Sequence, residues 1–286
     1  MPLFLIVGNG IAIYIVSQGL NELWLLGLLI TFILLSFALE RLAPFDVRFN
    51  QSQGDGPRDF IHALVNESSS VIGVLSVPFI ATFIPFTAVW PTALPLWLQV
   101  VIAVLIADIG ITLAHYASHR FDALWKLHAV HHSIKRMYGF NGLMKHPLHQ
   151  TIETVAGTMP LIFMGIPQEV LMLLVVAVLQ QLLLQHSNVA YFTGPLKRFY
   201  VSNAVHRFHH LNTAKEGDVN FGLFTTFTDH LLGSVYFDKD RIITTEDIGI
   251  STRPDYPVDY VSQLIEPFRT YQPIGKPISE LDDNGA

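Results

Sequence analysis

The hydrophobic pattern of the chain begins with two apolar runs joined by a short polar tip. Residues 2–20 are apolar apart from a Gly-Asn-Gly interruption, residues 23–39 form a second run, and Asn21 and Glu22 separate them. A helix that crosses the hydrocarbon core of a membrane needs about 20 mostly apolar residues. The pattern therefore predicts a helical hairpin, in which the second run is the better candidate for a span.

Further apolar runs alternate with polar connections along the rest of the chain. Residues 40–60 are polar and contain Gly54-Asp55-Gly56, which predicts a loop. Apolar runs follow at residues 63–90, 96–114, 151–164 and 168–185. The last two flank Gly165-Ile166-Pro167 and predict another hairpin. Beyond His186 the sequence is more polar, and the tail after about Arg253 is rich in proline and acidic residues.

This alternation predicts an all-α fold, a polytopic membrane bundle of four to six membrane-embedded helices with a cytosolic helical cap. We expect three parts. Residues 1–95 would hold the N-terminal membrane helices and their connecting loop, residues 96–240 a central domain, and residues 241–286 a cytosolic tail. The N-terminal run has no Lys or Arg before it, so we expect a retained membrane segment and not a cleaved signal peptide.

The composition agrees with a membrane protein and excludes several classes of site. Hydrophobic residues make up 51% of the chain and charged residues 14%, against about a quarter in soluble domains. The absence of cysteine excludes disulfides, zinc–thiolate sites and cysteine-ligated iron–sulfur clusters. A net charge of −6 without a dense basic run gives no indication of a nucleic-acid partner.

The positive charges predict the orientation in the membrane. All 17 Lys and Arg residues fall within residues 41–58, 120–145 or 197–276, and none falls in the tips at 21–22, 87–95 or 165–168. Cytoplasmic loops carry an excess of Lys and Arg. We therefore expect the N-terminus and every basic segment on the cytosolic face, either of a bacterial inner membrane or of the endoplasmic reticulum.

Eight of the 13 histidines fall into three short motifs, the first directly before the basic segment 120–145 and the other two within basic segments. The motifs are His115-x3-His119, His128-x2-His131-His132 and His206-x2-His209-His210. Side chains three or four residues apart share one face of a helix, so each motif presents its imidazoles to a common side. Eight imidazoles exceed the coordination number of one ion, and they suit two ions with four or five nitrogens each.

The identity of the metal does not follow from the ligands alone, because imidazole suits Zn, Cu, Fe and Ni. A structural zinc site uses four ligands, often cysteine, and does not need eight histidines. The alternative is that the histidines are ordinary core residues. We apply that interpretation to His62 and His230, which stand outside the motifs.

Two aspartates lie where they could support the histidines. Asp108 is seven residues before His115, on the same helical face and inside an apolar run, where a carboxylate is expensive and usually functional. We expect it to accept a hydrogen bond from the second ring nitrogen of a ligand. Asp229 could do the same for the third motif, or could simply cap a turn.

At these motifs the chain resembles a known family, the fatty acid hydroxylase/sterol desaturase superfamily of integral-membrane, non-haem di-iron oxygenases. The resemblance rests on DIGITLAHYASHRFDALWKLHAVHHS (108–133), QHSNV (185–189) and VHRFHHLNTAKEGDVNFGLFTTFTDHLLGS (205–234). It covers roughly residues 100–240 and implies that residues 96–240 are a hydroxylase-like catalytic domain. It also implies two irons, held by the three motifs and at least one further histidine.

By its position, the resemblance implies that His186 is this further ligand. His146, which precedes Pro147, matches a His-Pro element of the family and is either a pocket residue or a ligand. The chain departs from the common family pattern at Tyr116, at His149 and at Thr228-Asp229-His230. These departures leave the metal site intact and leave the identity of the substrate open.

The function that the resemblance implies is dioxygen-dependent hydroxylation or desaturation of an unactivated C–H bond in a fatty acyl lipid, sterol or related substrate. No haem, flavin or iron–sulfur motif occurs in the chain, so we expect an external electron donor, namely a cytochrome b5, a ferredoxin or an NAD(P)H reductase. Lys135 and Arg136 could dock an acidic donor or contact anionic lipid headgroups.

Three other functions remain open at this point. A divalent-metal transporter would need ligands at mid-membrane, whereas these histidines gather at the ends of the apolar runs. A membrane zinc hydrolase is disfavoured because no HExxH motif occurs. A metal-stabilised protein without catalytic activity would carry the same histidines.

Overall fold

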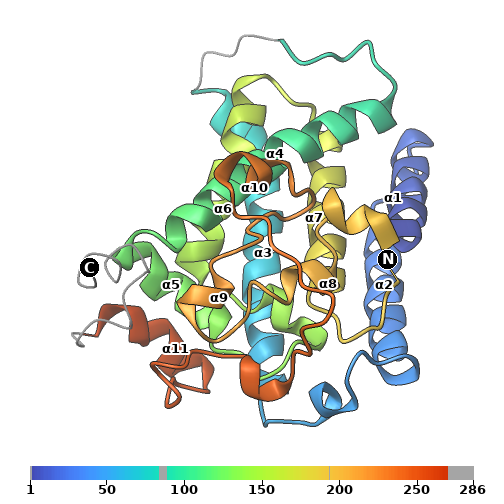
Figure 1. Ribbon diagram of the computed structural model, residues 1–286. Helices are drawn as coiled ribbons and strands as arrows, with labels where there is room; N and C mark the ends of the chain where they lie inside the picture. The colour runs from blue at the N-terminus through green and yellow to red at the C-terminus, as the bar shows by residue number, and fades with distance from the viewer. Residues whose placement is uncertain (1, 84–88, 193, 270–286) are drawn as a thin grey trace.

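The computed structural model describes residues 2–83, 89–192 and 194–269 (Figure 1). Within these residues the fold is helical, and three isolated β-bridges are its only extended pairings. The longer helices are α1 (Pro2–Ser17), α2 (Leu23–Leu42), α3 (Gly56–Ala81), α4 (Leu96–Ser118), α5 (Asp122–His132), α6 (Pro147–Phe163) and α7 (Gln168–Gln185). Four short helices follow: α8 (Asn203–His206), α9 (Ala214–Gly217), α10 (Phe227–Leu232) and α11 (Tyr260–Ile265). Single 3₁₀ turns occupy Val47–Asn50, Gly139–Leu143, Gly194–Arg198, Thr245–Asp247 and Glu266–Phe268.

Four helices are long and apolar enough to cross a membrane: Leu23–Leu42, Gly56–Val77, Leu96–Ser118 and Gln168–Gln185. A shorter apolar helix spans Leu3–Ser17, and α6 is interrupted by Pro160. Large apolar side chains such as Trp24 and Leu34 on α2 and Ile72 on α3 are exposed on the protein, which is the arrangement expected where lipid covers them. The expected all-α membrane bundle is confirmed, and the chain is a membrane protein.

Helix α7 lies at the centre of this bundle. It contacts α1, α2, α3 and α4, and 72% of its apolar window is buried, against 17–39% for the other three spans. A helix that is apolar on all sides is buried on all sides. In Figure 1, α1 and α2 lie together at one edge of the bundle, and α7 lies beside them.

Helices α4 and α6 cross at an unusually short distance because small residues meet at the crossing. A Cβ atom on Gly110 would lie 2.1 Å from the carbonyl oxygen of Ala156, and one on Gly157 would lie 2.8 Å from Ile111. Only glycine allows this approach. The crossing fixes the end of α4, with its first histidine motif, relative to the start of α6.

The loop predicted at residues 40–60 is shorter in the structure, because α2 ends at Leu42 and α3 begins at Gly56. Helix α3 begins at Gly56, with Pro57 in its first turn, where a missing N–H is harmless. Its first turns are polar, yet Arg58, Asp59 and Asn66 are buried. They contact the cap and not lipid: the Asn141 amide donates to Asp59, and the Asn66 amide donates to the carbonyl of Leu143.

The cap forms at the end of the bundle where α4 and α7 finish and α3 and α6 begin. It consists of α5, the connection from α5 to α6, and the segments that follow α7, which are drawn from yellow-orange to red in Figure 1. Glu40, near the end of α2, joins the cap to the bundle by accepting hydrogen bonds from the backbone N–H groups of Gly139 and Asn188. The three histidine motifs all lie at this junction.

Candidate metal centre

Four short segments supply the histidines of the candidate site. His115 lies in the last turn of α4 and His119 is the residue that ends it. Helix α5 carries the second motif in its last two turns, and Asp122 in its first turn interacts favourably with the helix dipole. His186 terminates α7, and the third motif runs from α8 into the turn after it.

Five histidines form a first group, called here the five-histidine cluster: His115, His119, His128, His132 and His209. One ring nitrogen of each lies within 4.8 Å of the others, and all five residues are buried. The Nε2 atom of His115 is 2.9 Å from Nε2 of His128 and 2.8 Å from Nε2 of His209. The Nε2 atom of His132 completes this ring, 3.1 Å from that of His128 and 3.0 Å from that of His209.

Four histidines form a second group, the four-histidine cluster: His131, His186, His206 and His210. The Nε2 atom of His186 lies 3.1 Å from that of His131, 3.1 Å from that of His210 and 3.0 Å from that of His206. His186 is therefore at the centre of this cluster, where its place in the chain and the family resemblance had put it.

The motifs divide between the two clusters, which differs from the expectation that each motif faces one side. His131 and His132 are neighbours in the chain but belong to different clusters. The same holds for His209 and His210. Consecutive residues on a helix point about 100° apart, so a helix end inserted between two sites can serve both. The two clusters therefore lie side by side, and the second and third motifs stand between them.

The hydrogen bonds of the Nδ1 atoms determine whether the converging Nε2 atoms carry a proton or a lone pair. The Nδ1–H groups of His115, His209 and His131 donate to the backbone carbonyls of Phe221, Val219 and Met144 at 2.8, 2.9 and 3.1 Å. A carbonyl can only accept, so in these neutral imidazoles Nε2 carries the lone pair. Two nitrogens whose lone pairs face each other cannot form a hydrogen bond. A cation bound between them would stabilise this arrangement.

Burial favours the neutral imidazoles that a metal requires. Removal from water lowers the pKa of His128, His132 and His209 well below the usual value, and it lowers the pKa of His186 to about 3. Neighbouring histidines lower the first three further. The Nε2 atom of His119 is buried and has no partner within the described residues. The donor set therefore fits metal ions bound by neutral nitrogens.

Two acidic residues that the sequence did not suggest support the five-histidine cluster. Asp218 accepts the Nδ1–H of His119 at 2.8 Å and is held by Arg120 at 2.5 Å. On the other side, the ring of His149 lies 4.4 Å from that of His128, and Glu153 follows one helical turn later, paired with Lys145. These residues are too far from the motifs in sequence, or too ordinary in type, to be recognised without the fold.

Asp108 and Asp229 act on a loop and not on a histidine. Asp108 accepts the backbone N–H groups of Leu223, Phe224 and Thr225 at 3.2, 2.7 and 3.0 Å. Asp229 accepts those of Phe221 and Gly222, both at 2.8 Å. The expected hydrogen bonds from ligand nitrogens to these carboxylates are therefore not formed. Both aspartates instead fix the loop whose Phe221 carbonyl orients His115.

The remaining histidines lie outside the two clusters. His146 precedes α6, where its Nδ1 accepts the backbone N–H of Leu148 and its Nε2 donates to the carbonyl of Leu264. His62 is a satisfied core residue between the carbonyl of Lys145 and the side chain of Gln263, as expected. The expectation that His230 is a core residue is wrong: His230 is exposed and donates to the carbonyl of Arg198.

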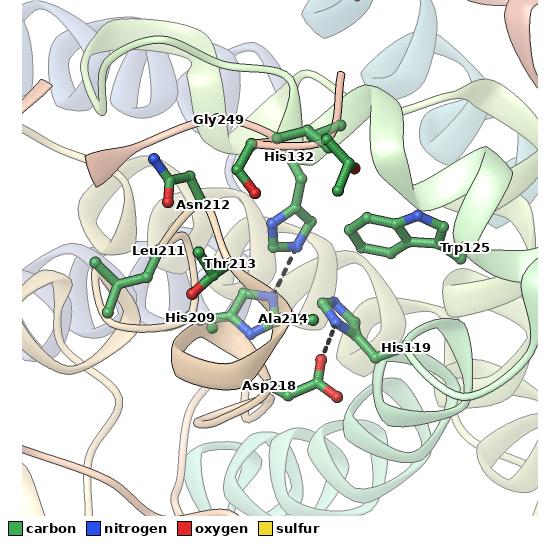
Figure 2. Close-up of a pocket in the computed structure, with 14 residues that line it drawn as sticks. His119, Trp125, His132, His209, Leu211, Asn212, Thr213, Ala214, Asp218 and Gly249 are labelled. Carbon is green, nitrogen blue, oxygen red and sulfur yellow. Dashed lines mark hydrogen bonds and ion pairs between the residues drawn. The ribbon is translucent and has the colours of Figure 1, made fainter. Parts of the chain in front are cut away.

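A cavity of about 370 Å³ gives access to the five-histidine cluster from the cap (Figure 2). His119, His132 and His209 form its floor, and Trp125 stands beside them, 5.1 Å from the ring of His119. Two segments, 211–218 and 249–252, form its walls with both polar and apolar side chains, among them Asn212, Leu211 and Ile250. A small molecule can thus reach one cluster from the cap without passing through the bundle.

Comparison with known proteins finds relatives of the part of the chain that holds the histidines. Residues 100–234 match the family model for fatty acid hydroxylase. This match agrees with the resemblance of the histidine motifs to the fatty acid hydroxylase/sterol desaturase superfamily, and it supports a hydroxylase. It is 28% identical over 277 residues to the ornithine lipid hydroxylase OlsE of Rhizobium tropici, in an alignment that covers 93% of this chain and 82% of that protein. No solved structure matches the chain.

Proposed function

We propose that this chain is a multi-pass membrane enzyme that uses two iron ions and dioxygen to hydroxylate a lipid. The observation that carries the proposal is the convergence of nine buried imidazole nitrogens into two adjacent clusters. Separations of 2.8–3.2 Å between nitrogens match the edges of a coordination shell with metal–nitrogen distances of about 2.0–2.1 Å. Each cluster would hold one ion.

Iron is favoured over the other metals that imidazole binds because the chain resembles a superfamily of di-iron oxygenases, and its residues 100–234 match the fatty acid hydroxylase model. Two irons, when bound, supply the redox chemistry that activates dioxygen for attack on an unactivated C–H bond. The chain itself contributes neutral ligands, buried side chains, and backbone carbonyls that orient four of the rings, those of His115, His131, His186 and His209. A carboxylate, Asp218, strengthens His119 as a donor.

The substrate is proposed to be an acyl lipid, with hydroxylation preferred to desaturation. Both preferences are supported by the family and by the relative whose name describes a hydroxylase of ornithine lipid. The lipid-facing bundle gives such a substrate lateral access to the protein. A sterol substrate has no comparable support.

The cap and its basic segments are proposed to face the cytosol. This orientation follows the distribution of Lys and Arg and puts the opening above His119 within reach of a soluble partner. Reducing equivalents would come from a cytochrome b5, a ferredoxin or an NAD(P)H reductase that docks on the cap. Residues 96–240 would be the catalytic part of the chain, between the N-terminal helices and the tail.

Metal analysis and product analysis of the purified protein test this proposal. We expect two irons per chain and a Mössbauer spectrum of an antiferromagnetically coupled pair in the oxidised protein. Supplied with a donor system and isotopically labelled dioxygen, the protein should place labelled oxygen in a lipid product. Two zinc ions with no redox response, or a metal that is transported across vesicles, would reject the assignment.

A further inference from the structure

A second cavity, of about 260 Å³, lies between α3, α4, α6 and α7 on the membrane side of the metal centre. Its two ends differ in chemistry. One end is lined by Glu67, Ser70, Gln150 and Thr151, and the other by apolar residues such as Ile162 and Leu171. Gln150 and Ile162 are twelve residues apart on α6, or about 18 Å along its axis. The cavity therefore has the length and the polarity gradient of a lipid.

The polar end adjoins the histidines. Ile111, which lines the cavity, is one helical turn before His115 on α4. Gln150 directly follows His149, whose ring lies 4.4 Å from that of His128. A lipid in this cavity would therefore have its head and the adjoining carbons near the five-histidine cluster, and its chain end deep in the bundle.

Glu67 lies at this polar end of the cavity, and its carboxylate has no hydrogen-bond or ion-pair partner among the described residues. The other acids near the site, by contrast, are engaged. An ionised carboxylate in an apolar cavity is costly unless a cation compensates it, and Lys145, which attracts Glu67, is already paired with Glu153. A ligand is a natural source of the compensating charge.

The hydroxyl groups beside Glu67 offer further acceptors. Ser69 and Ser70 donate to the backbone carbonyls of Val65 and Asn66, and Thr151 donates to that of Pro147. Because their hydrogens are used within their own helices, their oxygen lone pairs remain for a ligand. The end of the cavity is thus rich in acceptors, and it complements a cation with several N–H groups.

We propose that this cavity binds the lipid substrate with a protonated amine of its head group against Glu67 and an acyl chain along α6 and α7 towards Leu171. This inference rests on the proposed lipid hydroxylase function and names the class of lipid: an acyl lipid that carries a free amine. Ornithine lipid, in the name of the relative from Rhizobium tropici, belongs to this class.

Binding of two matched probes to the metal-loaded protein in detergent tests the inference. One probe is a fluorescent acyl-ornithine lipid, and the other is the same lipid with its amine acetylated. We expect the wild-type protein to bind the free amine about ten- to hundredfold more tightly, the range of a charge-assisted hydrogen bond. Glu67→Gln should abolish this preference. Glu169→Gln, an exposed acid at the start of α7 outside the cavity, should keep it.

Equal binding of the two probes by the wild-type protein, or an unchanged preference in Glu67→Gln, would overturn the inference. Metal content and thermal unfolding of each variant show whether it has folded, and the wild-type comparison does not depend on any variant. The two proposals can fail separately. If the protein prefers the free amine through Glu67 but hydroxylates no lipid, the binding cavity is supported and the proposed function is rejected. If it hydroxylates a lipid but shows no preference for the amine, the function is supported and the binding cavity is rejected.

Discussion

The ring nitrogens that point away from the two clusters hold the site together at the scale of single residues. In five of the nine histidines, Nδ1 donates to a carbonyl or to a carboxylate: His115, His119, His131, His186 and His209. These hydrogen bonds set both the ring orientation and the tautomer. Of the five acceptors, only Asp218 is a side chain, so it is the one that substitution can remove.

Asp218→Asn should weaken metal binding without unfolding the protein. The amide keeps the shape of the side chain but loses the charge that raises the basicity of His119. Removal of such a partner typically lowers metal affinity or activity about 10- to 100-fold. Metal retention during a chelator titration measures the effect. Asp240→Asn, which removes an exposed acid paired only with Lys239 at 3.7 Å, serves as the control. Equal metal retention in both variants would contradict this role.

The sequence could identify the ligands but not their supports. Motif spacing selected eight histidines and the family resemblance added His186, and all nine converge in the two clusters. Asp218 is 99 residues from His119, so only the fold shows that they touch. The aspartates chosen from sequence, Asp108 and Asp229, are buried as expected of functional carboxylates, yet they bind backbone N–H groups. The sequence thus predicted that these two carboxylates are important, but it did not predict the groups that they bind.

At the scale of helices, the crossing of α4 and α6 makes a second prediction. Gly110→Ala would place Cβ 2.1 Å from the carbonyl oxygen of Ala156, and backbone cannot yield as a flexible side chain can. Overpacking of this kind costs about 1–3 kcal/mol or more. We expect a lower unfolding temperature and weaker metal retention, because α4 carries His115.

The matched control for this variant is Gly27→Ala on α2. A Cβ atom at Gly27 meets nothing within 4 Å, and alanine is the better helix former. This variant should be as stable as the wild type or more so. If both glycine substitutions lowered the unfolding temperature equally, close packing at the crossing would not be the cause.

Hydropathy predicted the helices within the bundle better than the helix turns that face the cap. The runs at 96–114 and 168–185 correspond closely to α4 and α7. The start of α3 was missed because its polar residues, such as Arg58 and Asp59, are buried against the cap and not in lipid. An apolar pattern identifies contact with lipid or core, but it cannot show a polar helix face that is satisfied by another part of the chain.

For the whole molecule, the absence of cysteine allows a direct test of orientation. Asn21→Cys places a thiol in the tip between α1 and α2, and Lys239→Cys places one on the cap, where the side chain is exposed. We expect a membrane-impermeant maleimide to label the first in intact cells and the second only after permeabilisation. The unmodified protein is the blank. The reverse pattern would place the histidines on the opposite face.

Acid should destabilise the metal-free protein. The pKa of His186 is lowered from 6.5 to about 3 by burial, so the unfolded chain binds a proton that the folded one resists. Stability is then complete above the unfolded pKa and is lost as the pH falls from about 6.5 towards 3. Thermal unfolding of the metal-free protein between about pH 4 and pH 7 measures this slope. A flat profile would mean that these imidazoles are not buried.

The paired histidines of the second and third motifs have one more consequence. His131 and His132, like His209 and His210, are joined by a single peptide bond but belong to different clusters. An ion that orders one residue of each pair therefore also positions the other residue for the second ion. Binding at the first site lowers the ordering needed at the second, which is positive cooperativity. Metal loading should pass from empty to doubly filled protein with little of the singly filled form, and loss of one ion should be followed by loss of the other.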